Sequence, residues 1–343
     1  MRSWRPAAGL IDRTLDAIPP ASGAVVMGTG IVSTALSLDG HETISRVVLV
    51  LTALTWVALA GLLPARAARD RDRFRADVRT PAALTSVAGT AVLGTRLALL
   101  GWDWEGAGLL VIALVLWAAL LVPVLTNWRT PTFGASLVLT VSTESLAVLA
   151  AILATREHAH WLLVAALAPF GLGLAFYLFV IARFDLAQLA VGRGDHWVTG
   201  GALAISTLAA ARITIGARAL AMLGAGDGVL KAFALGLWAL TMLWLPVLLL
   251  AEALRPRLGY DVRRWSTVFP VGMYAACSFA VGQAAHASVV RGFARVWVWV
   301  ALAVWGVVSA AMIRRAVQIL HGEQRPTAPD GGNGLAPRRG SAV

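Results

Sequence analysis

The sequence predicts an all-α membrane protein with ten transmembrane helices arranged as five helical hairpins. Of its 343 residues, 58% are hydrophobic and only 14% are charged, and the mean hydropathy is +0.74. Apolar runs of about 20 residues, the length that crosses a bilayer as a helix, recur along the chain. The arginines fall mainly in the segments between these runs. A water-soluble domain of this size could not bury so much apolar surface.

Ten runs of apolar or small residues are long enough to span a membrane. In lipid only helices and closed barrels satisfy their own backbone polar groups, and the alternating ten-residue strands of a barrel are absent from the sequence. Each run is therefore expected to be a helix. The expected spans are residues 21–38, 44–64, 81–101, 106–126, 134–155, 159–183, 197–222, 229–253, 265–288 and 292–318.

Three segments make up the predicted domain organisation. Residues 1–19 are expected to form a cytoplasmic N-terminal segment with no cleavable signal peptide, so the first span would serve as the insertion signal. Residues 20–318 form one transmembrane domain. Residues 319–343 are rich in Gly, Pro and Arg and are expected to be a disordered cytoplasmic tail.

Positive charge is divided unequally between the two sets of loops. The two tails, the loops near 65–80, 127–133, 184–196 and 254–264, and their flanks hold 21 of the 29 Lys and Arg residues. The opposite loops hold six. The positive-inside rule therefore predicts a cell-membrane protein with both termini in the cytoplasm. An even number of spans also requires both termini on one side.

The odd-numbered spans are rich in small and hydroxylated residues, whereas the even-numbered spans are dominated by Leu, Val and Trp. Small-residue centres near 28, 89, 143, 206 and 275 recur about every 60 residues, the length of one hairpin. Because small residues let helices approach closely in lipid, we expect five odd helices inside and five even helices outside. Gly28, Thr29, Gly30 and Ser206 are then expected to line a central pore. The alternative is a solid bundle in which small residues serve only for packing.

Several motifs in the same order and spacing resemble one family over nearly all of residues 20–318. The first is the run from Pro20 to Ile31, with the sequence PASGAVVMGTGI. The others are Thr80-Pro81, Gly194-Asp195-His196-Trp197, and the run from Trp265 to Pro270. The sequence thereby resembles the tellurite-resistance and C4-dicarboxylate transporter family. That family includes the plant slow anion channels, the fungal malic-acid permeases and sulfite efflux pumps.

The resemblance implies a ring of five inner and five outer helices around a central conduit, within a homotrimer. It implies transport of small anions such as malate, sulfite, nitrate or chloride. It further implies that Phe269, beside Pro270 on the ninth span, occludes the pore. The residues themselves leave ordinary packing open for Phe269, although Pro270 frees a backbone hydrogen bond and permits a kink.

Two ionisable residues, Glu144 and Arg212, lie deep in predicted inner spans. Each costs about 2.5–3.5 kcal/mol to insert unless it is paired or hydrated. One interpretation is a Glu144–Arg212 ion pair that fixes helix packing. In the other, Arg212 attracts anions, while Glu144 is a proton site of a proton-coupled efflux carrier and is neutral when an anion passes. Arg96, near the end of the third span, is expected to reach the membrane interface or Trp102 rather than bind substrate.

No catalytic motif is visible, so an enzyme is the least favoured class. Met27-Gly28-Thr29-Gly30 lacks the preceding strand and the third glycine of a dinucleotide fingerprint. His158 and His160 are too few for a metal site, and the lone Cys277 cannot form an internal disulfide. We therefore expect no metal, no cofactor and no nucleic-acid partner. The expected partners are membrane lipid and a small anion.

Overall fold

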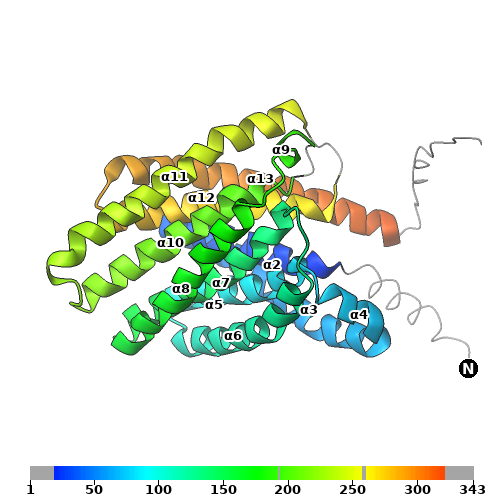
Figure 1. The fold of residues 1–343 in the computed structure, drawn as a ribbon, viewed down its shortest axis with the longest axis horizontal. Helices are drawn as coiled ribbons and strands as arrows, with labels where there is room; N and C mark the ends of the chain where they lie inside the picture. The colour runs from blue at the N-terminus through cyan, green and yellow to red at the C-terminus, as the bar shows by residue number, and fades with distance from the viewer. Residues whose placement is uncertain (1–18, 192–193, 257–259, 321–343) are drawn as a thin grey trace, which may run out of the picture.

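A computed structural model describes residues 19–191, 194–256 and 260–320. The expected cytoplasmic N-terminal segment and the expected disordered tail lie almost entirely outside the described residues. Figure 1 shows long helices running side by side, with the short helix α4 at one end of the bundle beside α3. The predicted all-α fold is confirmed for the described part of the chain, whose long elements are all helices.

Five consecutive pairs of long helices make up the bundle. In each pair a short connection joins a first helix to a second one, as the repeat of about 60 residues predicts. The pairs are α2 (Gly23–Leu38) with α3 (Glu42–Arg69), α5 (Thr85–Leu100) with α6 (Asp103–Thr126), α7 (Val138–Arg156) with α8 (His160–Ile181), α10 (Trp197–Ala219) with α11 (Asp227–Leu254), and α12 (Trp265–Ala284) with α13 (Ser288–Leu320). The short elements are α4 (Arg71–Asp77), α9 (Gln188–Val191), η1 (Pro20–Ser22), η2 (Pro81–Leu84), η3 (Gly134–Leu137), η4 (Gly224–Gly226) and η5 (Val262–Arg264).

Burial separates the first helix of each pair from the second. In the most apolar stretch of α2, α5, α7 and α10, between 78% and 100% of the residues are buried, whereas the corresponding share in α3, α6, α8, α11 and α13 is 17–28%. All residues of α12 except Ser266 and Gln283 are buried. We call α2, α5, α7, α10 and α12 the inner helices and their partners the outer helices. The prediction that small residues mark the buried helices is confirmed.

Among the described residues, nine helices are long and apolar enough to cross a membrane. The protein is thus a multi-pass helical membrane protein. The remaining predicted span is the ninth, residues 265–288, and it corresponds to α12, which has 20 residues but does not belong to the nine. It lies between α2, α10 and α13 and contains two serines, a threonine, a tyrosine and Pro270. The count of ten spans stays a prediction.

Contacts between the inner helices follow a closed order. Helix α2 packs against α5, α5 against α7, α7 against α10, α10 against α12, and α12 against α2. Glycines allow these close approaches. A Cβ at Gly28 of α2 would lie 2.9 Å from the Trp265 ring, and a Cβ at Gly201 of α10 would lie 2.7 Å from the Pro270 ring. Small residues therefore serve as contact points between neighbouring inner helices, as expected for association in lipid.

Four outer helices also hydrogen-bond to the inner helix of the next pair. In each case a tryptophan indole N–H donates to a hydroxyl oxygen, and we call these the indole–hydroxyl contacts. They are Trp56 to Thr90 (2.9 Å), Trp117 to Thr143 (2.9 Å), Trp238 to Ser278 (2.8 Å) and Trp305 to Thr29 (3.2 Å). The contacts link α3 to α5, α6 to α7, α11 to α12 and α13 to α2, so they hold successive pairs together around the bundle.

The sequence predicts that Arg96 reaches the membrane interface. Arg96 instead is fully buried between α3 and α5. Its Nη2 atom donates to Glu42 (2.7 Å) and its Nε atom to the Ser45 hydroxyl (2.9 Å). Glu42 begins α3 at the same end of the bundle where α5 ends, so a carboxylate lies within reach of the guanidinium. Pairing removes most of the cost of burial, which explains why a buried guanidinium is tolerated near this end of α5.

The indole–hydroxyl contacts predict a measurable loss of stability on removal. Trp238→Phe keeps the apolar ring but deletes the donor to Ser278. We expect a loss of about 0.6–1.7 kcal/mol, the usual range for interhelical hydrogen bonds in membranes. Thermal unfolding in detergent micelles measures it. Trp161→Phe is the matched control, because Trp161 is 72% exposed. Equal midpoints for the two variants would contradict a stabilising role.

Candidate functional site

A small cavity lies where all five inner helices meet, and we call it the axial cavity. Its volume is about 10 Å³, roughly the space of one water molecule. Six of its eight lining side chains are apolar, so it offers few hydrogen bonds to a water or an ion. The lining residues are Ile31 of α2, Val92 and Thr95 of α5, Ser145 and Val148 of α7, Ile205 and Leu208 of α10, and Met273 of α12.

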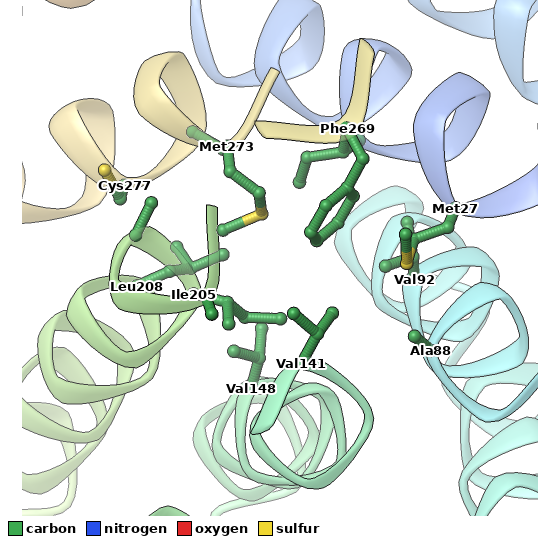
Figure 2. Close-up of a cluster of buried hydrophobic side chains, with 14 of the residues drawn as sticks. Met27, Ala88, Val92, Val141, Val148, Ile205, Leu208, Phe269, Met273 and Cys277 are labelled. Carbon is green, nitrogen blue, oxygen red and sulfur yellow. The ribbon is translucent and has the colours of Figure 1, made fainter. Parts of the chain in front are cut away.

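Phe269 lies one turn before Met273 on α12 and is fully buried. Figure 2 shows its ring pointing from α12 toward Val141 of α7, with Met273 and Val92 on either side. The ring therefore extends across the axis of the inner helices beside the axial cavity. Pro270 packs against Gly201 of α10 at the next position. In this conformation the axis is closed by apolar side chains.

The four small residues expected to line a pore are buried, but none belongs to the lining of the axial cavity. Gly28 contacts α12 at Trp265, and Gly30 lies against Val92 of α5. Thr29 accepts the indole N–H of Trp305. The Ser206 hydroxyl donates to the Ala202 carbonyl on its own helix (3.1 Å). These small and hydroxylated residues face neighbouring helices, and larger apolar residues occupy the axis instead.

Arg212 lies on the same face of α10 as the cavity residues Ile205 and Leu208. It follows Leu208 by four residues, which places it one helical turn further along the same face. Its side chain is 8% exposed. Within the described part of the chain, its Nε and Nη2 atoms have no hydrogen-bond partner. Arg212 is thus a buried cation without a counterion in reach, beside the axis rather than at the lipid surface.

Glu144 points away from the axis, toward α8 and α10. A Cβ at Gly173 of α8 would lie 2.5 Å from the Glu144 Cγ atom, so the carboxyl side chain fills the space above that glycine. Ser206 of α10 is the hydroxyl side chain that faces the carboxyl group. Glu144 is fully buried, and among the described residues neither of its oxygens has a partner at hydrogen-bonding distance.

The expected Glu144–Arg212 ion pair is not formed in the described structure. Glu144 faces α10 at Ser206, and Arg212 is six residues further along that helix. At a rise of about 1.5 Å per residue, the two lie about 9 Å apart along the axis. Counting residues from the end of each predicted span does not reveal this separation between Glu144 and Arg212, because α7 and α10 differ in length.

Four of the five outer helices donate an indole–hydroxyl contact to the inner helix of the next pair. Among the described residues, no such contact joins the remaining outer helix, α8, to α10. Gly173 of α8 lies against the Glu144 side chain where α8 meets α10. The Glu144 side chain fills the space beside that glycine and faces the Ser206 hydroxyl. Glu144 is therefore the buried polar side chain at a contact where the described residues form no indole bond. Sequence reasoning missed this role, although the lack of a central tryptophan in residues 159–183 was a signal for it.

The described residues form an inner set of buried helices with apolar side chains at the axis and a buried arginine beside it, an arrangement compatible with a membrane channel or transporter. Residues 17–313 match the voltage-dependent anion channel family, and the chain belongs to that family. Membership implies transport of anions through a channel-like membrane protein. The family consists of channels and transporters, which supports a function other than catalysis.

Two curated membrane proteins of Mycobacterium tuberculosis are similar to part of the chain. One is from strain CDC 1551 / Oshkosh and the other from strain ATCC 25618 / H37Rv. Each is 36% identical over 141 residues, which cover 39% of this chain and 71% of the relative. Each is described as an uncharacterized membrane protein. These relatives support the membrane assignment.

The position of Glu144 predicts a specific coupling with Gly173. Gly173→Ala should destabilise the protein because the new methyl group meets the Glu144 side chain. Glu144→Ala should be destabilising alone but should relieve that clash, giving a coupling energy of at least about 1 kcal/mol in a double-mutant cycle. Unfolding midpoints in detergent measure the cycle. Gly171→Ala is the control on the same helix, since nothing lies within 4 Å of a Cβ there. Additive effects would contradict this placement of Glu144.

Proposed function

We propose that the protein conducts small anions along the axis of the five inner helices, with Phe269 as the gate and Arg212 as an anion-attracting residue. The observation that carries this proposal is the unpaired Arg212, buried on the face of α10 that lines the axial cavity. A buried cation without a partner is costly, and an anion in the pathway would offset that cost. Membership in an anion-channel family supports the same conclusion.

The gate is inferred from the closure of the axis. An anion entering this region would lose its hydration shell against Phe269, Met273 and Val141, and apolar constrictions close channels by excluding water. Rotation of the Phe269 ring would open the space between α5 and α7. The proline at 270 leaves the backbone there without one helical hydrogen bond, so α12 can adjust locally.

The wider proposal follows from the sequence and the family. It comprises ten spans in two rings around a pore, both termini in the cytoplasm, a cell-membrane location and a homotrimer. The permeants are proposed to be C4-dicarboxylates such as malate, or inorganic anions such as sulfite, nitrate and chloride. Flux of each anion into proteoliposomes, with and without a pH gradient, tests the proposal. No flux of any anion would reject it.

A second candidate is a proton-coupled efflux carrier that uses Glu144. The buried carboxyl group without a hydrogen-bond partner favours it. Its direction toward α8 and away from the axis favours a packing role instead. Glu144→Gln distinguishes them, because it keeps the shape and removes the titrating group. Flux that then loses its dependence on a pH gradient supports the carrier, and unchanged flux supports the channel.

Removing the Phe269 ring should open the pathway. We expect Phe269→Ala to raise anion flux at least about tenfold, which corresponds to a barrier lowered by about 1.4 kcal/mol. Chloride efflux from proteoliposomes measures it. Phe293→Ala on the outer helix α13 is the control, because Phe293 stacks on Trp297 away from the axis. Equal flux through both variants and the wild type would exclude Phe269 as the gate.

Removing the positive charge of Arg212 should lower flux in a background where the gate is open. We expect Arg212→Gln, combined with Phe269→Ala, to reduce chloride flux at least about tenfold, while Arg212→Lys retains most of it. Arg295→Gln is the control, since Arg295 is an exposed cation with a 71% accessible side chain. If the Gln variant matched the control, Arg212 would have a role in packing only.

A further inference from the structure

A second, larger cavity lies outside the axis, and we call it the side pocket. Its volume is about 410 Å³, which is in the range of ligand-binding pockets. It opens between the outer helices α3 and α6, which pack against α2 and α5 but make little contact with each other. Residues from α2, α3, α4, α5 and α6 line it.

The side pocket is almost entirely apolar and lies along membrane-spanning helices. Leu59 and Leu63 of α3 face Leu116 and Leu120 of α6, and Gly89 of α5 lies on the inner wall. The indole N–H of Trp56 is already bonded to Thr90, and the hydroxyls of Ser22 and Ser86 donate to backbone carbonyls. Water and polar ligands therefore find few partners there. A hydrocarbon chain fits this lining.

One end of the side pocket meets a strongly basic segment. Residues 66–79 contain six arginines and three aspartates. Arg66 is buried at the pocket wall and paired with Asp77, and Phe74 of α4 also lines the pocket. Arg71, Arg73 and Arg79 are exposed beside it. The apolar cavity thus ends at a cationic rim at the level expected for lipid headgroups.

We propose that the side pocket binds an anionic phospholipid, with one acyl chain between α3 and α6 and the headgroup on the arginines of residues 66–79. The apolar walls recognise the chain, and charge complementarity selects the headgroup. A basic rim next to a hydrocarbon cavity within a membrane protein matches both halves of such a lipid. This site is separate from the axial cavity.

Native mass spectrometry of the purified full chain, titrated with phosphatidylglycerol or phosphatidylcholine of equal chain length, tests the proposal. The wild type should bind phosphatidylglycerol more tightly. Ala60→Trp, which fills the pocket from α3, should weaken its binding at least about tenfold. Val57→Trp, an exposed position one turn away outside the lining, should not. Leu116→Trp and its control Leu114→Trp repeat the comparison from α6, should a variant on α3 fail to fold.

The headgroup is tested separately. Replacing Arg71, Arg73 and Arg79 together by Gln should reduce phosphatidylglycerol binding at least about tenfold, to near the level of phosphatidylcholine. Replacing Arg314 and Arg315 by Gln is the control. Equal binding of phosphatidylglycerol by the wild type and by the Ala60→Trp variant would overturn the proposal. Competition by free glycerol phosphate as strong as by the lipid would show a phosphate site instead. Loss of oligomers in Ala60→Trp, with lipid binding unchanged, would show that a second copy of the chain fills the pocket.

Discussion

The structure depends on one constraint of the bilayer, which offers no hydrogen-bond partners to polar groups inside it. Every hydroxyl, indole and guanidinium of the inner helices must therefore find a partner within the protein or carry a cost. Many hydroxyls bond to carbonyls of their own helix, and Thr29, Thr90, Thr143 and Ser278 also accept an indole N–H from an outer helix. These bonds fix the rotation of α2, α5, α7 and α12, because the hydroxyl of each must face the outer helix of the preceding pair.

The rotation decides what remains at the axis. Because the hydroxyls that accept an indole N–H and several glycines face neighbouring helices, mostly apolar side chains remain at the axial cavity, among them Ile31, Val92, Val148, Ile205 and Met273. A dry, apolar axis is then a consequence of satisfying the polar groups elsewhere. In the proposed channel this gives a tight closed state, since an ion would lose its hydration there without gaining a ligand.

The fold was largely predictable because it follows from composition and period. Runs of about 20 apolar residues, the repeat of about 60 residues and the contrast between small-residue and Leu-rich spans identified the hairpins and the buried helices. The face that each residue presents was not predictable. Helix rotation depends on contacts between pairs, such as Trp305 with Thr29, whose partners lie 276 positions apart in the sequence. Gly28, Thr29, Gly30 and Ser206 were therefore expected at the axis but lie at helix contacts.

Two buried ionisable residues of the inner helices, Glu144 and Arg212, have no ion-pair partner among the described residues, and they follow the same logic with opposite outcomes. A third, Arg96, is paired with Glu42. Glu144 lies off the axis, at the contact of α8 and α10 where the described residues form no indole–hydroxyl contact, and its side chain fills the space beside Gly173 without meeting the proposed pathway. Arg212 is a permanent cation, because a guanidinium stays protonated under ordinary conditions. It keeps its charge on the cavity face of α10 with no acidic group in reach among the described residues. A fixed cation that the protein does not neutralise is best satisfied by a mobile anion, and this requirement makes Arg212 the residue most directly tied to the proposed transport.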